Sequence, residues 1–291
     1  MSGSLRIWKY HGTGNDFVLL EDLAGDRPLT AAFTAAVCDR RFGVGADGVI
    51  RVAPGRTPEE DAFMDYRNAD GSLAEMCGNG VRCLGAFLYD EGLVPKAELT
   101  VGTRAGTKRL RLELLGGRVH AVTVGMGPPR LARGEIPMTG PAEEPFLGRP
   151  FEVDGRVFTA AAVSMGNPHL VLLLDHEPTA EEVRSLGPRI EQDERFPERT
   201  NVELVHPEEG VLVARVWERG SGETMACGTG ACAVLVAANE TGLAPRRAEV
   251  RFPGGTVVVE RTEEEVLLTG PAERVFAGTL DEGWMRARGL V

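Results

Sequence analysis

The most constraining feature of this chain is that its two halves repeat one another. A cysteine opens a glycine-rich turn at Cys77-Gly78-Asn79-Gly80 and again at Cys227-Gly228-Thr229-Gly230, 150 positions later. Upstream, Gly14-Asn15-Asp16-Phe17 and Gly166-Asn167-Pro168-His169 are each followed by three apolar residues, at an offset of 152. The 291 residues therefore predict two homologous halves of ordinary domain size.

The crossover between the halves is expected in the proline-rich stretch 128–150. We predict an N-terminal half over residues 1–127 and a C-terminal half over residues 128–270, with residues 271–291 packing back on the first half. Strand-length segments rich in β-branched and aromatic residues dominate both halves, with a helix over residues 30–41. The run 231–238 after the second cysteine turn has no polar face, so other structure must enclose it. The pattern predicts mostly β structure wrapped around one apolar helix in each half.

Charge and composition argue against some classes of binding partner and favour one cellular location. A net charge of −11 argues against nucleic acid or an anionic membrane surface as a partner. The longest apolar run, 231–238, is far shorter than the ~20 residues of a membrane span, and no basic-then-apolar leader precedes Trp8. We therefore expect a cytoplasmic protein without membrane contact. Its five cysteines are expected to be reduced thiols, since an odd number does not suit a disulfide framework: Cys38, Cys77, Cys83, Cys227 and Cys232.

The two cysteine turns indicate acid/base chemistry. A thiol at a helix N-terminus is expected to have its pKa lowered from ~8.5 toward neutrality, and the bare amides of the flanking glycines suit a carboxylate. If the halves pack about a pseudo-twofold axis, one thiolate can remove the proton from the α-carbon of a bound carboxylate, and the opposite thiol can protonate the other face of that carbon. A pyridoxal phosphate racemase needs a Schiff-base lysine. Only Lys9, Lys96 and Lys108 are present, none in a suitable motif, so no cofactor is expected.

Eight short segments between about Lys9 and Gly278 carry a resemblance to a known family. They are HGTGNDF (11–17), GVGADG (43–48), NADGS (68–72), MCGNG (76–80), GNPH (166–169), TNV (200–202), WERG (217–220) and ACGTG (226–230). In this order they resemble diaminopimelate epimerase. The resemblance implies an α+β fold of two pseudo-symmetric halves, each a β-barrel-like sheet wrapped around a central apolar helix. It also implies interconversion of LL- and meso-2,6-diaminopimelate, without cofactor or metal, in lysine and cell-wall precursor biosynthesis.

The resemblance also implies roles for individual residues. Cys77 and Cys227 match the thiol pair, assisted by His169 and Glu218 respectively. Arg219 matches the residue that binds the distal carboxylate, for which a guanidinium fork is well suited. The full set of implied substrate contacts is Asn15, Asn68, Gly78, Asn79, Asn167, Asn201, Glu218, Arg219, Gly228 and Thr229.

The chain departs from the family pattern at two positions. Gly48 stands where many members have a glutamine that contacts substrate, so no contact is expected there. Phe276 stands where many members have a tyrosine at the dimer contact. Phenylalanine keeps the aromatic ring at this contact of the expected homodimer and lacks the hydroxyl.

Several alternatives stay open at this point. A related cofactor-independent racemase acting on proline or hydroxyproline is one, although Glu218-Arg219 and the four asparagines favour a long dipolar substrate. A non-catalytic or thiol-redox relative is another. A zinc site or a phosphate loop is disfavoured, because neither the cysteine gaps nor the residues after the glycines match those motifs. The remaining cysteines and histidines are expected to be structural or on the surface: Cys38, Cys83, Cys232, His11, His120, His176 and His206.

Overall fold

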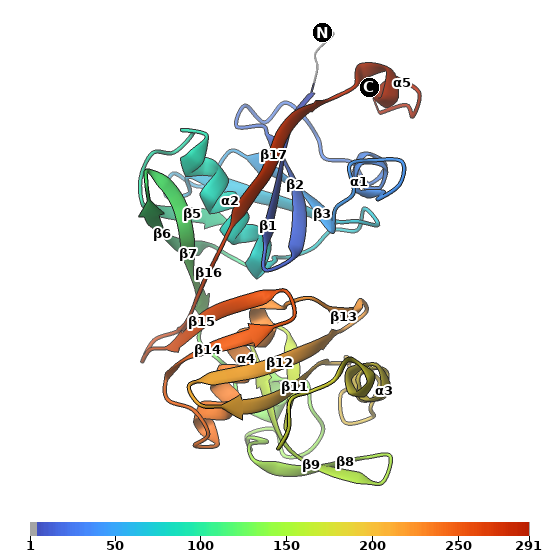
Figure 1. Cartoon of the computed structure of the whole chain (residues 1–291), viewed down its shortest axis with the longest axis vertical. Coiled ribbons are helices and arrows are strands. Elements are labelled where there is room, and N and C mark those ends of the chain that lie inside the picture. Colours follow the sequence, from blue (N-terminus) through green and yellow to red (C-terminus); the bar gives the residue numbers. More distant parts are fainter. Residues whose placement is uncertain (1–4, 291) are drawn as a thin grey trace. The chain divides into compact units, whose positions relative to one another are not determined.

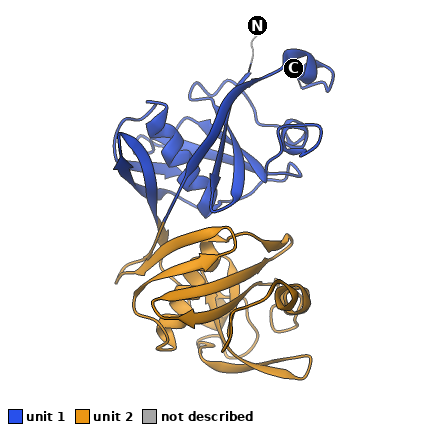
Figure 2. Ribbon diagram, in the orientation of Figure 1, with its two compact units in different colours: residues 1–124, 270–291 blue, residues 125–269 orange. Residues whose placement is uncertain are grey.

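The structure is a computed structural model that describes residues 5–290, and the chain divides into two compact units. Unit 1 comprises residues 1–124 and 270–291, and unit 2 comprises residues 125–269 (Figure 2). The expected boundaries, 127/128 and 270/271, lie within three residues of these.

Unit 1 is a single row of neighbouring strands with three helices (Figure 1). Starting from β17, which pairs antiparallel with β1, the row continues through β2 and β3 to β7. The C-terminal segment thus lies against the first strand of the chain, with Leu280 opposite Leu5. The elements are β1 (Leu5–Gly12), β2 (Asn15–Glu21), α1 (Ala31–Cys38), β3 (Gly48–Ala53), β4 (Ala62–Asn68), α2 (Gly78–Asp90), β5 (Glu98–Gly102), β6 (Lys108–Leu115), β7 (Arg118–Gly127), β17 (Glu273–Leu280) and α5 (Glu282–Arg286).

Unit 2 is built in the same way. Its row begins with β8 and β9 and continues through β10, β11, β12, β14 and β15 to β16, while the short β13 also pairs with β12. The elements are η1 (Arg133–Glu135), β8 (Arg149–Val153), β9 (Arg156–Ser164), β10 (Pro168–Leu173), α3 (Ala180–Glu191), β11 (Asn201–Glu208), β12 (Val211–Glu218), β13 (Gly222–Thr224), α4 (Gly228–Glu240), β14 (Arg247–Phe252), β15 (Gly255–Arg261) and β16 (Val266–Gly270).

The two rows share one pattern of strand directions. In each unit, two pairs of parallel strands are joined through a helix: β2–α1–β3 and β4–α2–β5 in unit 1, β10–α3–β11 and β12–α4–β14 in unit 2. The other neighbours in each row are antiparallel. The α+β class expected from the sequence is confirmed, and the internal repeat is a repeat of topology.

One helix in each unit forms the centre of its sheet. Helix α2 contacts strands along its whole row, including β1, β2, β3, β5, β6 and β17, and α4 does the same from β9 to β15. Every side chain from Ala231 to Ala238 is 0% exposed. Burial of this apolar run, as the lack of a polar face predicts, holds the N-terminus of α4 in a fixed place.

Three helices differ from the sequence expectation, and one of them is the five-residue α5, which was not expected. The helix expected over residues 30–41 ends at Cys38, because the Asp39 carboxylate accepts hydrogen bonds from the backbone N–H groups of Arg41 and Phe42, both at 2.7 Å, and turns the chain. Helix α3 was not anticipated. Its start carries a capping box, in which the Thr179 side chain binds the Glu182 N–H and the Glu182 side chain binds the Thr179 N–H.

The remaining thiols behave as core residues. Cys38, Cys83 and Cys232 are buried, and none of the five cysteines forms a disulfide. Among residues 5–290, no helix is both long and apolar enough to cross a membrane.

Candidate active site

Both cysteines of the repeated turns are N-cap residues. Cys77 precedes α2 and Cys227 precedes α4, each with extended backbone (φ −136° and −123°). Their Sγ atoms accept hydrogen bonds from the N–H groups of Gly80 at 3.5 Å and Gly230 at 3.4 Å. A sulfur atom thus occupies the place where a helix end offers unpaired N–H groups and partial positive charge.

The second glycine of each turn packs closely against the sheet. A Cβ on Gly80 would lie 2.8 Å from Met64 Cε, and a Cβ on Gly230 would lie 2.7 Å from Glu203 Oε1. Each turn therefore rests directly on its sheet, and this contact brings the thiol to the side chains at the strand ends.

In unit 1, Cys77 is partly exposed and hydrogen-bonded to a neutral amide. Its Sγ donates to Asn15 Oδ1 at 3.4 Å, and Asn79 Nδ2 donates to the same oxygen at 3.4 Å. Asn15 Nδ2 in turn donates to Asp47 Oδ2 at 2.7 Å. Asp47, which the sequence did not single out, thereby fixes the orientation of the Asn15 amide beside the thiol.

A charged network holds Asp47 in place. Arg40 binds both Asp16 and Asp47, at 2.8 and 2.7 Å, and Lys9 binds Asp16 at 2.6 Å. Burial favours the neutral form of Asp16, but the hydrogen bonds from Arg40 and Lys9 outweigh it and lower its pKa to about 2. Asp16 therefore stays ionised at neutral pH.

An arginine that the sequence reasoning missed lies under the first turn. Arg82 is 0% exposed, and its guanidinium donates to Asn79 Oδ1 at 2.8 Å and to the Gly78 carbonyl at 3.3 Å. Its hold on Oδ1 leaves the Asn79 Nδ2 to face Asn15. A single arginine inside an otherwise apolar run was the available signal.

Asn68 and Gly48 lie opposite each other on β4 and β3. Asn68 is half-buried and donates from Nδ2 to Ser72 Oγ at 3.0 Å. A Cβ on Gly48 would lie 2.4 Å from the Tyr66 ring and 2.5 Å from the Arg67 carbonyl. The departure from the family pattern at Gly48 thus has a packing cause, because no side chain fits beside this tyrosine.

In unit 2, Cys227 lies in a more negative and more buried environment. It is 7% exposed, and Thr229 Oγ1 lies 3.4 Å from its Sγ. Burial, followed by the charges of Glu218 and Glu203, raises the pKa of Cys227 well above that of an ordinary thiol. For this cysteine the expected lowering of the pKa by the helix end was wrong, because desolvation and the two carboxylates dominate.

Glu218 ends β12 beside this thiol. It accepts hydrogen bonds from Cys227 and from Thr224, and burial raises its pKa despite them. The two groups form a proton-sharing pair of the kind that acid/base sites require.

His169 belongs to the same unit as Cys227. The ring is 0% exposed, with Nδ1 2.7 Å from Glu203 Oε1 and Nε2 3.0 Å from Asn167 Oδ1. Asn167 Nδ2 donates to Thr229 Oγ1 at 3.3 Å. A continuous chain of hydrogen bonds therefore runs from Glu203 through His169 and Asn167 to the residue beside the thiol.

Arg219 is exposed, and its position is set by Asn201. Asn201 is 3% exposed, accepts a hydrogen bond from the Arg219 N–H at 2.9 Å and donates to the Pro168 carbonyl at 2.7 Å. The Arg219 guanidinium donates to the Glu198 carbonyl at 3.0 Å. Asn201 is thus engaged in holding the backbone of Arg219, in addition to any contact it makes with substrate.

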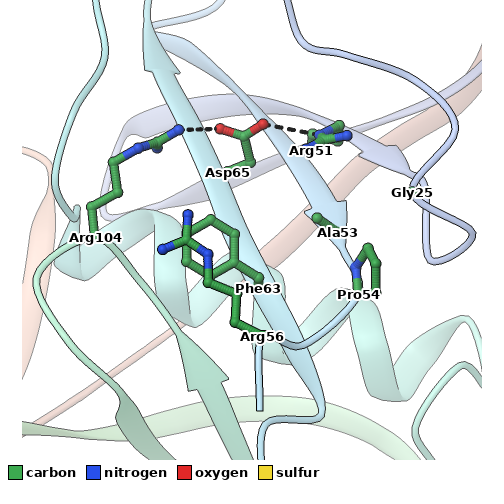
Figure 3. A pocket seen from close by; sticks show the side chains of 8 residues that line it. All are labelled: Gly25, Arg51, Ala53, Pro54, Arg56, Phe63, Asp65 and Arg104. Carbon is green, nitrogen blue, oxygen red and sulfur yellow. Dashed lines mark hydrogen bonds and ion pairs between the residues drawn. The ribbon is translucent and has the colours of Figure 1, made fainter.

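Unit 1 also contains a pocket of about 310 Å³ on the other face of its sheet (Figure 3). Arg51 and Asp65 line it, while the neighbouring Ile50 and Met64 point to the opposite face and contact the Gly80 turn. It is lined by Gly25, Arg51, Ala53, Pro54, Arg56, Phe63, Asp65 and Arg104.

The charges of this pocket are largely satisfied within the protein. Asp65 binds Arg51 and Arg104 from either side, as Figure 3 shows, and Arg51 also binds Asp22 at 2.9 Å. The Arg56 guanidinium stacks on Phe63, 3.5 Å from its ring centre. The cluster ties the loop before α1 to the sheet, and we assign it no ligand. Over the described part of the chain, no three His, Cys, Asp or Glu side chains are arranged to hold a metal ion.

Solved structures identify the fold class. The structure is similar to a probable proline racemase from Agrobacterium radiobacter K84 (TM-score 0.68, 16% identity, 96% of this chain and 93% of that chain). It is equally similar to a hydroxyproline epimerase from Agrobacterium vitis (TM-score 0.68, 14% identity, 97% and 94%). Its fold is therefore the one that these two proteins share.

Sequence comparison gives the family. The diaminopimelate epimerase model matches residues 7–132 and 161–275. Proteins called diaminopimelate epimerase from Moorella thermoacetica and Pelotomaculum thermopropionicum are 47% and 45% identical, over 93% and 94% of this chain and 97% and 98% of theirs. The chain belongs to the diaminopimelate epimerase family and is an isomerase.

Proposed function

We propose that the protein interconverts LL- and meso-2,6-diaminopimelate by a two-base mechanism that uses Cys77 and Cys227. The observation that carries the proposal is the matched pair of N-capping thiols, one at each glycine turn, in a chain of this family. The reaction lies in lysine and cell-wall precursor biosynthesis. The substrate is longer than proline and carries charged groups at both ends, and the protein binds it through Arg219 and the four asparagines.

Each half-site supplies what inversion of an α-carbon needs. The bare N–H groups of Gly78-Asn79 and Gly228-Thr229 bind the carboxylate at the reacting end, where negative charge grows as the α-proton leaves. Arg219 binds the distal carboxylate, while Asn15, Asn68, Asn167 and Asn201 orient the ammonium and carboxylate groups. The two thiols act on opposite faces of the same carbon, and no cofactor takes part.

The different environments of the thiols support different resting roles. Because burial and two carboxylates raise the pKa of Cys227, this residue rests as a thiol, hydrogen-bonded to Glu218. It is the proton donor, and the base is then Cys77, with His169 as its acid/base partner. In the reverse direction Cys227 becomes the base and Glu218 takes up its proton, for which the raised pKa of Glu218 is suited.

The homodimer and the cytoplasmic location are part of the same proposal. Two apolar side chains of β17, Val275 and Phe276, are 58% and 43% exposed and offer a surface for a second copy. The mechanism needs both thiols reduced, which is the condition of the cytoplasm.

The direct test is to incubate the purified, reduced protein with LL-diaminopimelate and no added cofactor, and to separate the stereoisomers. The meso isomer should appear and approach a stable ratio with the LL form. A parallel incubation with L-proline and with trans-4-hydroxy-L-proline should give no inversion. Inversion of either cyclic amino acid, with LL-diaminopimelate unchanged, would favour the racemase alternative.

A further inference from the structure

A carboxylate that the proposed reaction does not use is buried against His169. Glu203 lies on β11 and is 0% exposed, and its Oε1 is 2.7 Å from His169 Nδ1. Its other oxygen, Oε2, is also buried and accepts no hydrogen bond from the residues that the structure describes. Burying an ionised carboxylate costs free energy unless the charge is paired. The pairing with His169 is therefore the interaction that offsets this cost for Glu203.

The contacts of the histidine ring define where its protons lie. Nδ1 faces a carboxylate oxygen, which only accepts, so Nδ1 carries a hydrogen. Nε2 faces the Asn167 amide at 3.0 Å. When Asn167 Oδ1 faces the ring, Nε2 donates a hydrogen bond to it and so carries a hydrogen as well. When the Asn167 amide is rotated by half a turn, Nε2 carries no hydrogen and accepts a hydrogen bond from Nδ2. Gain or loss of a proton at Nε2 therefore needs only a rotation of the Asn167 amide, while Nδ1 stays bonded to Glu203.

We propose that Glu203 is a positioning residue that holds the Nδ1–H of His169 and so confines proton exchange to Nε2. This inference rests on the proposed function, since it takes His169 to be an acid/base partner in epimerisation. A buried carboxylate that fixes the tautomer and orientation of a histidine has the same task in the Ser-His-Asp triad.

Contact with the second cysteine turn supports this role. A Cβ on Gly230 would lie 2.7 Å from Glu203 Oε1, the same oxygen that binds His169. The charge of Glu203 also contributes to the raised pKa of Cys227 and of Glu218. The Glu203 carboxylate thus contacts both the second cysteine turn and the His169 ring. Its charge also acts on Cys227 and Glu218, the other pair of titratable groups in unit 2.

The experiment compares the wild-type protein with Glu203→Gln, Glu203→Asp and a matched control, Asp65→Asn. Glutamine keeps the shape of Glu203 and removes its charge. Asp65 is likewise a buried, ion-paired carboxylate, but it lies on the face of unit 1 away from Cys77. Steady-state kcat and KM with LL-diaminopimelate are measured for each protein. Nitrogen-15 NMR of labelled histidine, assigned with His169→Gln, reports the protonation of Nδ1 and Nε2.

Glu203→Gln should lower kcat at least about 10-fold with little change in KM, since loss of a carboxylate that orients a histidine costs about 10- to 100-fold at metal sites and about 10⁴-fold in the Ser-His-Asp triad. The His169 nitrogen signals should shift in the same variant, Glu203→Asp should restore part of kcat, and Asp65→Asn should keep wild-type kcat.

Wild-type kcat in Glu203→Gln, or a wild-type His169 without a proton on Nδ1, would overturn the proposal. If Glu203→Gln does not fold, the wild-type NMR pattern and Glu203→Asp decide the question. If the wild-type protein does not act on LL-diaminopimelate, the proposed function fails, and the NMR pattern still tests the pairing.

Discussion

The two N-capping thiols have different neighbours although their turns match in sequence. Cys77 is partly exposed and hydrogen-bonded to the neutral amide of Asn15, whereas Cys227 is buried beside the carboxylates of Glu218 and Glu203. A repeat in the chain therefore places two identical groups in electrostatically distinct sites. In the mechanism we propose, this difference lets one thiol rest as an acid while the other works as a base.

The first prediction concerns the charge beside Cys227. Because Glu218 raises the pKa of this thiol, Glu218→Gln should lower it and shift the pH profile of iodoacetamide alkylation of Cys227 to lower pH. Rates are measured by peptide mass spectrometry from neutral to alkaline pH, and alkylation of Cys77 in the same samples is the internal control. An unchanged profile, or a shift to higher pH, would show that Glu218 does not set the protonation of Cys227.

At the level of elements, the glycine turns connect the central helices to their sheets. Both turns are tight for the same reason, yet they meet different atoms. The space above Gly80 is limited by the flexible end of Met64, and the space above Gly230 by the Glu203 carboxylate that binds His169. Equivalent substitutions in the two units should therefore have unequal effects.

The second prediction compares Gly80→Ala with Gly230→Ala. A methyl group at position 80 meets only side-chain ends, Met64 Cε at 2.8 Å and Ile50 Cδ1 at 3.1 Å, and alanine favours helix by about 1 kcal/mol over glycine, so the free energy of unfolding should change by less than about 1 kcal/mol. A methyl group at position 230 displaces a buried carboxylate and should cost about 1–3 kcal/mol. Denaturant unfolding measures both. Equal losses would mean that the Gly230 contact with Glu203 is not important for stability.

The sequence predicted the elements whose signals are local. The apolar run after Cys227 and the cysteine N-caps follow from residues that are neighbours in the chain. The end of α1 was misjudged because the side chain of Asp39 competes for backbone N–H groups, and α3 was overlooked although its capping box was readable.

The functions of Asp47, Arg82 and Glu203 were not readable from the sequence. Each is a single charged residue whose partners come from distant segments: Asn15 for Asp47, Asn79 and Thr13 for Arg82, and His169 for Glu203. Without the strand register, a lone charge in an apolar stretch does not reveal which amide or ring it orients. The raised pKa of Cys227 depends on the same register.

At the level of the whole molecule, the chain is one topology used twice, with its last strand added to the first unit. Strand β17 completes the row of unit 1 by pairing with β1, and it presents Val275 and Phe276 to solvent. The register of β17 against β1 shifts at Val275, and neighbouring exposed apolar side chains of this kind offer a surface for a protein–protein contact.

The third prediction tests this surface. If the proposed homodimer forms through this surface, Phe276→Lys should convert it to a monomer, because burying an ammonium group between two copies is unfavourable. Size-exclusion chromatography with light scattering measures the mass, and the exposed Leu115 changed to lysine is the control for a charge added elsewhere on unit 1. A wild-type protein that is already monomeric would refute the dimer, and a Phe276→Lys dimer would place its contact elsewhere.

The most direct test of two-thiol epimerisation is the fate of solvent deuterium early in the reaction. With LL-diaminopimelate in deuterated water, one cysteine keeps the proton that it removes, and the other delivers a deuteron from its exchanged thiol. The meso product should carry deuterium at the inverted carbon while the remaining LL substrate stays largely protiated, and Cys77→Ala and Cys227→Ala should each suppress inversion by orders of magnitude. Substantial early deuterium in the recovered LL substrate, or an alanine variant that still inverts it freely, would contradict the mechanism.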